Sequence, residues 1–163
     1  MFSGFAASYG TKLEEDPFLA LYERAKATDG VDYIGPLAQP DLAGRLMNAA
    51  ALAYPSTFAE TSCIAVLEAM ASGAMVVTTA LGALPETTNG FSRLTEYETN
   101  PAQLSKTFAA AVVETLKDAK RNPDSALKKR AEQIGYIRAN YTWPARAREW
   151  QAWLSDIVRQ SHT

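Results

Sequence analysis

Short apolar runs alternate with helix-like segments over the first 95 residues of the chain. The runs are four or five residues long and are continuously apolar or β-branched, which is typical of strands that are covered on both faces. They predict strands at 1–5, 31–34, 51–54, 75–79 and 91–94. The segments between them have a helical pattern and predict helices at 16–28, 41–50 and 61–72.

Repeated strand–helix–strand units predict parallel strands joined by right-handed crossovers. The sequence therefore predicts an α/β fold, a Rossmann-like doubly wound parallel sheet of about five strands. Gly73 follows the third predicted helix directly and suits a helix C-terminus.

From residue 100 onward the pattern predicts helices only. Asn100-Pro101 begins one helix to about 120, Asn122-Pro123 the next to about 140, and Thr142-Trp143-Pro144 the last. In the last helix an apolar face has the i, i+3, i+4, i+7 spacing and consists of Trp150, Trp153, Leu154 and Ile157. This face predicts a terminal helix docked on a core.

Composition narrows the class of protein. With 163 residues, 47% hydrophobic and 21% charged, the chain fits a single soluble domain spanning 1–163. One cysteine excludes an internal disulfide, and Cys63 with His162 cannot form a structural zinc site. No signal peptide or membrane span is evident, so we expect a cytoplasmic protein. A pI near 5.5 gives no global attraction to nucleic acid.

The charge is divided unevenly between the two parts of the chain. Residues 1–100 carry a net charge of −7 and residues 101–163 a net charge of +5. Solvated helix faces are the favoured interpretation of the basic part. The alternative is a peripheral contact with an anionic membrane surface or an acidic partner.

The segment 54–90 offers the clearest chemistry. Ligands of open parallel sheets bind at the carboxyl ends of strands, and a helix N-terminus there is a seat for phosphate. Small residues at Thr61, Ser62 and Cys63 allow close approach to the backbone. Glu60 and Glu68 place two carboxylates near one helix, where they can accept hydrogen bonds from hydroxyl groups of a ligand.

This segment resembles the nucleotide-sugar-binding half of GT-B glycosyltransferases of the group 1, family 4-like, retaining type. The matching residues are Pro55-Ser56, Glu60, Glu68-Ala69-Met70-Ala71, Gly73, Val76-Val77, Gly82 and Pro85-Glu86. The flanking segments extend the resemblance over nearly the whole chain, including Tyr141-Thr142-Trp143 before the last helix. The resemblance implies one half of a GT-B fold, the donor lobe.

The resemblance also implies roles. Glu60 would contact the donor sugar near the reacting centre, and Glu68 would hold the ribose hydroxyls. Backbone amides of Thr61, Ser62, Cys63 and Ile64 would meet the sugar and distal phosphate, while Gly35, Pro36 and Leu37 would flank the base. The implied reaction is sugar transfer from a UDP- or GDP-linked donor with retention, without metal or other cofactor.

Two departures from the family pattern stand out. The family usually has Gly-Phe-Gly after the first Glu, where this chain has Thr61-Ser62-Cys63. The basic strand and loop that grip the diphosphate, and the acceptor lobe, have no counterpart before the predicted strand at 1–5. We therefore expect the isolated chain to be inactive, with an acceptor lobe in the same or a separate chain.

Other functions stay open. One is a non-catalytic nucleotide-binding or partner-binding module of the same fold. Another is a GT-B relative, such as a nucleotide-sugar epimerase or a phosphorylase. A signalling receiver domain is excluded, because its acidic cluster follows strand ends, whereas Asp29 precedes the predicted strand at 31–34 and Asp32 lies at its start.

Overall fold

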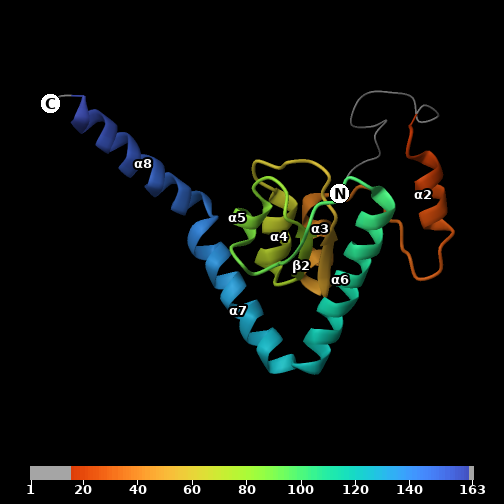
Figure 1. The fold of residues 1–163 in the computed structure, drawn as a ribbon. Helices are drawn as coiled ribbons and strands as arrows, with labels where there is room; N and C mark the ends of the chain where they lie inside the picture. The colour runs from red at the N-terminus through yellow and green to blue at the C-terminus, as the bar shows by residue number, and fades with distance from the viewer. Residues whose placement is uncertain (1–15, 162–163) are drawn as a thin grey trace. The chain divides into compact units, whose positions relative to one another are not determined.

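The computed structural model describes residues 16–161 of the chain. The chain divides into two compact units, Met1–Gly44 and Arg45–Thr163 (Figure 1). The predicted strand at 1–5 lies outside the described residues. The segment 54–90, which carries the predicted Glu60 and Glu68 site, belongs entirely to the second unit.

The first unit contains helix α2 (Leu19–Lys26) and the start of α3 (Gln39–Asn48), which runs across the boundary between the units. Between the two helices, the Tyr33 ring stacks on the Tyr22 ring at a centroid distance of 5.6 Å. The Lys26 ammonium lies 5.6 Å from the centroid of the Tyr33 ring. These local contacts hold the loop against α2.

The predicted strand at 31–34 is wrong, because residues 31–38 have no regular structure. Strand geometry is stabilised by ladder hydrogen bonds to a neighbouring strand. Here the Val31 amide instead donates to the Thr28 carbonyl at 3.1 Å, which closes a turn. Val31 is 47% exposed. The apolar residues of this run are therefore not covered on both faces, as the strand prediction assumed.

The second unit is built on a parallel sheet in the order β1–β2–β3. The strands are β1 (Ala51–Tyr54), β2 (Met75–Thr79) and β3 (Arg93–Thr95). Leu52 pairs with Val76, and Thr78 pairs with Leu94. The α/β prediction is confirmed for these three strands, whereas the five-stranded sheet is not.

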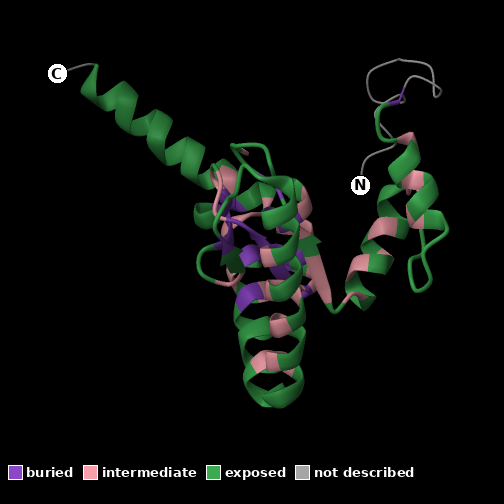
Figure 2. Ribbon diagram, turned by 45° about the vertical axis from the view of Figure 1, so that its right-hand side comes forward, coloured by how far each residue is buried: buried purple, intermediate pink, exposed green. Residues whose placement is uncertain are grey.

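Helices follow the strands as the crossovers require. They are α4 (Ile64–Ser72), α5 (Leu84–Thr88), α6 (Pro101–Arg121), α7 (Pro123–Asn140) and α8 (Trp143–Gln160). Helix α4 packs on β1, β2 and α7, and α6 packs on β2 and β3. Figure 2 shows that the buried residues are concentrated around the sheet and α4.

The core lies between α4 and the sheet and is made from small and medium apolar side chains. Val66, Ala69 and Met70 of α4 are fully buried against Val76 of β2 and Leu84 of α5. Val77, the next residue along β2, points to the other face of the sheet and is also fully buried. Burial of both faces explains why β2 reads as a continuous apolar run.

Helix α7 closes the C-terminal end of α4. Gly73 ends α4 in the left-handed conformation with φ 82°, as predicted from the sequence. The buried Gln133 side chain donates to the Met70 carbonyl at 3.0 Å and to the Ala74 carbonyl at 3.1 Å. The Arg130 guanidinium donates to the Ser72 carbonyl at 3.3 Å. The carbonyls at this helix end thus find donors on α7.

Helix α8 does not dock on the core, contrary to the prediction. Ala145, near its beginning, is its buried residue, and Trp150 and Trp153 are 59% and 55% exposed. The helix contacts α7 at its start and then extends away from the rest of the second unit (Figure 1). The helix itself was correctly predicted from the spacing of its apolar residues. However, no other element of the second unit covers this apolar face.

Candidate functional site

The candidate site lies at the carboxyl edge of the sheet, where the loops after β1 and β2 meet. Two threonine hydroxyls of β2 tie these segments together. Thr78 Oγ1 donates to the Tyr54 carbonyl at 2.8 Å, and Thr79 Oγ1 donates to the Ser56 carbonyl at 2.7 Å. Both threonines are fully buried, so these hydrogen bonds satisfy hydroxyls that water does not reach.

The loop after β2 holds the backbone of Glu60. The Ala83 amide donates to the Glu60 carbonyl at 2.7 Å. Gly82 has φ +57°, and a Cβ built there would lie 2.6 Å from both the Glu60 amide nitrogen and the Glu60 carbonyl oxygen. Only glycine fits such an approach and such a φ without strain. Glu60 is therefore positioned by a segment more than twenty residues away in the chain.

The Glu60 side chain is held as well. The Tyr54 hydroxyl, at the end of β1, donates to Glu60 Oε1 at 2.6 Å. Burial raises the pKa of the Tyr54 hydroxyl, and the neighbouring Glu60 carboxylate and Cys63 thiol raise it further. Tyr54 therefore stays protonated at neutral pH and keeps the Glu60 carboxylate in one orientation.

Helix α4 begins at Ile64, three residues later than the predicted start at 61. The Glu60 carbonyl, which would open a helix from 61 by accepting from the Ile64 amide, accepts from Ala83 instead. Thr61, Ser62 and Cys63 are consequently in a loop, with Cys63 as the extended N-cap residue.

The amide end of α4 is open. The Cys63 side chain makes no capping hydrogen bond, and the first amide to bond its carbonyl is that of Leu67. Cys63 itself is buried at 4% exposure, whereas Ile64 is 68% exposed. The first residue of α4, Ile64, therefore lies at the surface beside the loop that carries Glu60, whereas Val66, two residues later, is fully buried. An exposed helix start of this kind suits an anionic group.

Glu68 is the fifth residue of α4 and is half-buried. It lies about 6 Å along the helix axis from Ile64, at a rise of about 1.5 Å per residue. Glu60 thus lies in the loop before α4, and Glu68 lies within the helix. The binding roles of the two carboxylates stay predictions.

Gly35, Pro36 and Leu37, predicted to flank a base, belong to the other compact unit. They lie in the irregular segment between α2 and α3, where Gly35 has φ +65°. Their role beside a ligand remains a prediction.

Sequence reasoning missed Tyr54 and Ala83 and assigned no role to Gly82. Gly82 belongs to the motif, and its position before Pro85-Glu86 is typical of a turn. The sequence does not show that Gly82 lies against the Glu60 backbone. Tyr54 closes a predicted strand directly before Pro55-Ser56, yet no periodic pattern connects it with a residue six positions later. Both relationships depend on how the loops at the sheet edge meet.

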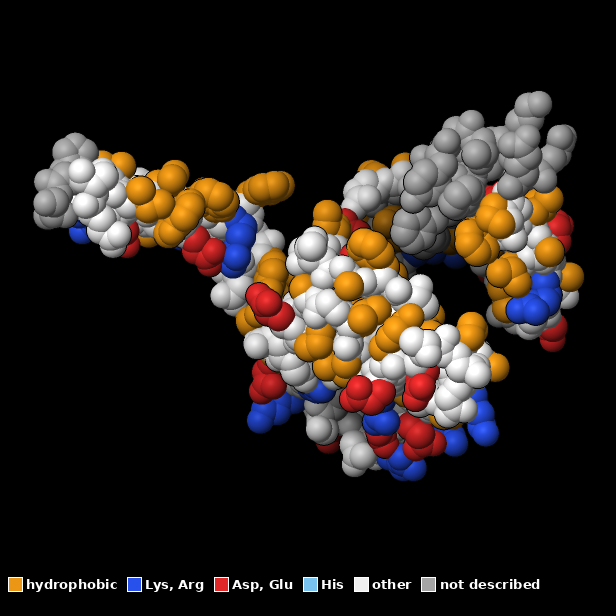
Figure 3. All heavy atoms as spheres, turned by 45° about the horizontal axis from the view of Figure 1, so that its top comes forward, with side chains coloured by type: hydrophobic (Ala, Val, Ile, Leu, Met, Phe, Trp, Pro, Cys, Tyr) orange, Lys and Arg blue, Asp and Glu red, His pale blue; other side chains and the backbone are white. Residues whose placement is uncertain are grey.

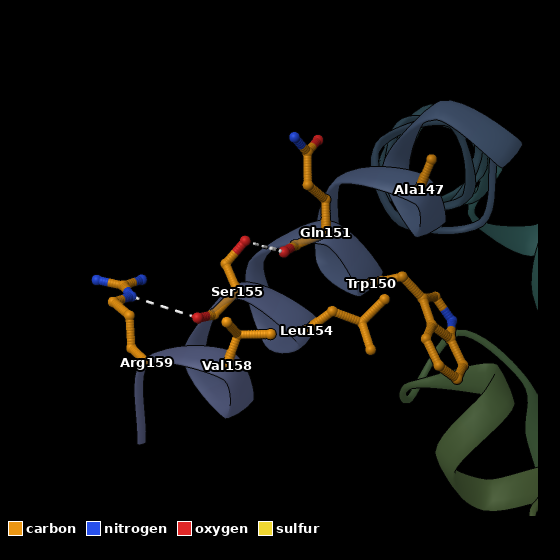
Figure 4. Close-up of a pocket in the computed structure, with 7 residues that line it drawn as sticks. All are labelled: Ala147, Trp150, Gln151, Leu154, Ser155, Val158 and Arg159. Atoms are coloured by element: carbon orange, nitrogen blue, oxygen red, sulfur yellow. Dashed lines mark hydrogen bonds between the residues drawn. The ribbon is translucent and has the colours of Figure 1, made fainter. Parts of the chain in front are cut away.

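A shallow hollow, separate from the candidate site, runs along α8 (Figure 4). Its volume is about 710 Å³, and it is lined by Ala147, Trp150, Gln151, Leu154, Ser155, Val158 and Arg159. All of these residues come from one helix, so the hollow is an open surface and not an enclosed site. Figure 3 shows hydrophobic side chains in a row along this helix.

Within residues 16–161, no group of three or more His, Cys, Asp or Glu side chains is placed to hold a metal ion. Among the same residues, no helix has the length and apolar character needed to cross a membrane.

A comparison with curated proteins found no match for this chain. The family model described as "Glycosyl transferases group 1" matches residues 8–118. The match includes the whole carboxyl-edge site, from Tyr54 through the loop after β2 and helix α4. It covers about two thirds of the chain and confirms the family indicated by the motif. The chain belongs to the group 1 glycosyl transferase family.

Proposed function

We propose that this chain is the donor-binding domain of a retaining glycosyltransferase, which holds a nucleotide-sugar for transfer to an acceptor. The observation that carries the proposal is the fixed Glu60 beside the open N-terminus of α4. Its backbone is bonded by Ala83 and its carboxylate by the Tyr54 hydroxyl. A site held in this way is preorganised for a ligand that carries both hydroxyls and phosphate.

The groups at the site divide the work of binding. The amides at the start of α4 bind the diphosphate, where the helix dipole favours negative charge. The second Oε atom of Glu60 accepts a hydrogen bond from a hydroxyl of the transferred sugar. The Glu68 carboxylate accepts hydrogen bonds from the ribose hydroxyls. Thr61 and Ser62 are exposed in the loop and supply hydroxyl donors where the family has glycine. The base contacts of Gly35–Leu37 belong to the same proposal.

The same amides stabilise the leaving group. When the bond between sugar and phosphate breaks, negative charge grows on the departing diphosphate, which the fixed N–H dipoles of α4 stabilise. The acceptor attacks from the face on which the donor phosphate departs, which is the retaining outcome. In this proposal the departing charge needs no metal ion.

The lobe by itself binds its donor weakly and turns over none. Among the described residues 45–100, the cationic side chains are Arg45 and Arg93. Arg93 begins β3, at the edge of the sheet opposite the site, and pairs with Asp118 at 2.6 Å. Arg45 lies in the last turn of α3, which precedes the amino end of β1. Neither cation lies in the loops at the carboxyl edge, so we propose that an acceptor lobe completes the site.

Calorimetric titration with UDP-glucose and GDP-mannose tests the proposal. We expect millimolar binding of at least one donor, and a loss of about tenfold in Glu68→Gln and in Glu60→Gln, since each removes an ionised acceptor. Glu132→Gln, an exposed carboxylate on α7, is the control and binds like the wild type. Absence of donor binding, or equal affinity in all four proteins, would overturn the proposal.

One observation favours a second candidate, a non-catalytic module of the same fold. Glycine is missing at Thr61-Ser62-Cys63, so the loop before α4 has lost the conformational freedom of the family pattern. Such a module binds a nucleoside diphosphate as tightly as the nucleotide-sugar. In the same titration, equal affinities for UDP and UDP-glucose, or for GDP and GDP-mannose, would favour this candidate. An epimerase-like relative would instead convert the donor sugar without any acceptor.

A further inference from the structure

A second cavity, of about 510 Å³, lies at the amino edge of the sheet, opposite the site described above. Its walls come from the first residues of β2 and β3 and from the facing sides of α6 and α7. The volume is within the range of small-molecule sites, about 300–1,000 Å³.

The charged residues of this wall give it a net positive charge. Arg93, Lys129 and Arg130 face one carboxylate, that of Asp118. Asp118 is already engaged by Arg93 at 2.6 Å and by Arg121. The hydrogen bond from Arg121 lowers the pKa of the Asp118 carboxyl, with the charge of Arg93 in support. Asp118 therefore remains ionised, and the lining charge is +2.

Lys129 is the cation of this wall without a partner among residues 16–161. Arg93 is paired with Asp118, and Arg130 donates to the Ser72 carbonyl at 3.3 Å. Lys128, the preceding residue, lies 4.0 Å from Glu132, but Lys129 has no such ion pair. The Lys129 ammonium lines the cavity and can donate hydrogen bonds to an anion there.

The cavity lining also contains apolar side chains. Met75 and Val76 come from β2 and Phe91 from the segment before β3, while Ala119 and Ala126 come from α6 and α7 beside the charged residues. The Phe91 ring is held by a tilted contact with Tyr136 at a centroid distance of 5.5 Å.

We infer that this cavity is a second binding site, for a small phosphorylated molecule with an apolar ring or chain. A phosphate monoester carries a charge near −2 at neutral pH, which matches the lining charge, and its apolar part fits the Phe91 side. The site uses none of the groups assigned to the donor and does not depend on the proposed function. Because its walls belong to β2, β3, α6 and α7, occupancy stabilises the second unit.

Phenyl phosphate, inorganic phosphate, benzoate and benzyl alcohol are suitable probes for the full chain. We expect phenyl phosphate to raise the melting temperature and to shift the amide NMR signals of Phe91, Ser92 and Ala126. Inorganic phosphate and benzoate bind more weakly, since each lacks either the ring or half of the charge, and benzyl alcohol does not bind. Benzyl alcohol binding as tightly as phenyl phosphate would contradict an anion site.

Two variants and a control locate the binding. Lys129→Gln lowers the affinity for phenyl phosphate about tenfold, since it removes one charge-assisted hydrogen bond. Ala126→Phe fills the cavity and abolishes binding, with the helical circular dichroism confirming the fold. Lys120→Gln changes an exposed lysine of α6 outside the lining and leaves the affinity unchanged. Equal affinity in all three variants, no binding at millimolar concentration, or shifts confined to residues 60–68 would overturn the inference.

Discussion

The Ala83 amide donates a 2.7 Å hydrogen bond to the Glu60 carbonyl. This bond joins the loop after β2 to the loop after β1, on the side of the sheet where the strands end. It also engages the Glu60 carbonyl, which therefore does not open a helix at 61, and α4 begins at Ile64. The position of the candidate site and the start of α4 thus depend on one contact between two loops.

Gly82→Ala should disturb this contact. The new Cβ would lie 2.6 Å from the Glu60 backbone at a φ of +57°, so either the loop or Glu60 has to move. We expect a loss of about 2–4 kcal/mol in the free energy of unfolding, measured by urea denaturation. Gly90→Ala is the matched control, since Gly90 has φ +77° but nothing within 4 Å of its Cβ. It should cost about 1 kcal/mol, and an equal loss in both would exclude the clash.

Tyr54→Phe should change the alkaline limit of stability. The folded protein raises the pKa of Tyr54 through burial and the Glu60 carboxylate, so stabilisation from this proton is complete below the ordinary tyrosine pKa of about 10. It is lost as the pH rises further, because the unfolded chain ionises first. Between pH 9 and 11, Tyr54→Phe should therefore lose less stability than the wild type.

Two details make this pH experiment specific. Tyr141 also has a raised pKa, caused first by burial, so part of the alkaline loss remains in Tyr54→Phe. Tyr97→Phe, which changes an exposed tyrosine, is the control and keeps the wild-type slope. Parallel pH profiles for wild type and Tyr54→Phe would count against a partly buried Tyr54–Glu60 hydrogen bond.

Gln133→Leu should weaken the packing of α7 on α4. The Gln133 amide is buried and donates to two carbonyls, those of Met70 and Ala74. The leucine removes both hydrogen bonds, and the Met70 carbonyl keeps the Gly73 amide as donor. We expect a loss of about 2–4 kcal/mol in the free energy of unfolding. Glu132→Leu, one residue earlier and exposed, should stay within about 0.5 kcal/mol of the wild type. A smaller loss in Gln133→Leu than in this control would contradict the capping role.

Asn100→Ala should remove the cap of α6. The Asn100 side-chain oxygen accepts from the Ala102 amide at 3.0 Å and from the Gln103 amide at 3.2 Å. Its loss should cost about 1 kcal/mol of stability. Thr99→Ala, directly outside the helix, serves as control, and thermal denaturation followed by circular dichroism distinguishes the two. If both variants melt together, the cap contributes nothing measurable.

The sequence alone determined the elements that local pattern controls. The apolar runs at 51–54 and 75–79 became β1 and β2 with the predicted bounds, and the helix breaks at Asn100-Pro101 and Asn122-Pro123 lie where α6 and α7 begin. The ordered motif from Pro55 to Glu86 gave the family, because it specifies residue types rather than geometry. Such signals need only neighbours within a few residues.

The tertiary structure decided the rest, because those features depend on partners far along the chain. The run at 31–34 is no strand, since its backbone closes a turn with Thr28 instead of joining the sheet. The start of α4, the need for glycine at 82 and the Tyr54–Glu60 bond all follow from how two loops meet at one sheet edge. The exposure of α8 follows likewise, since a helical period identifies an apolar face but not the surface that covers it.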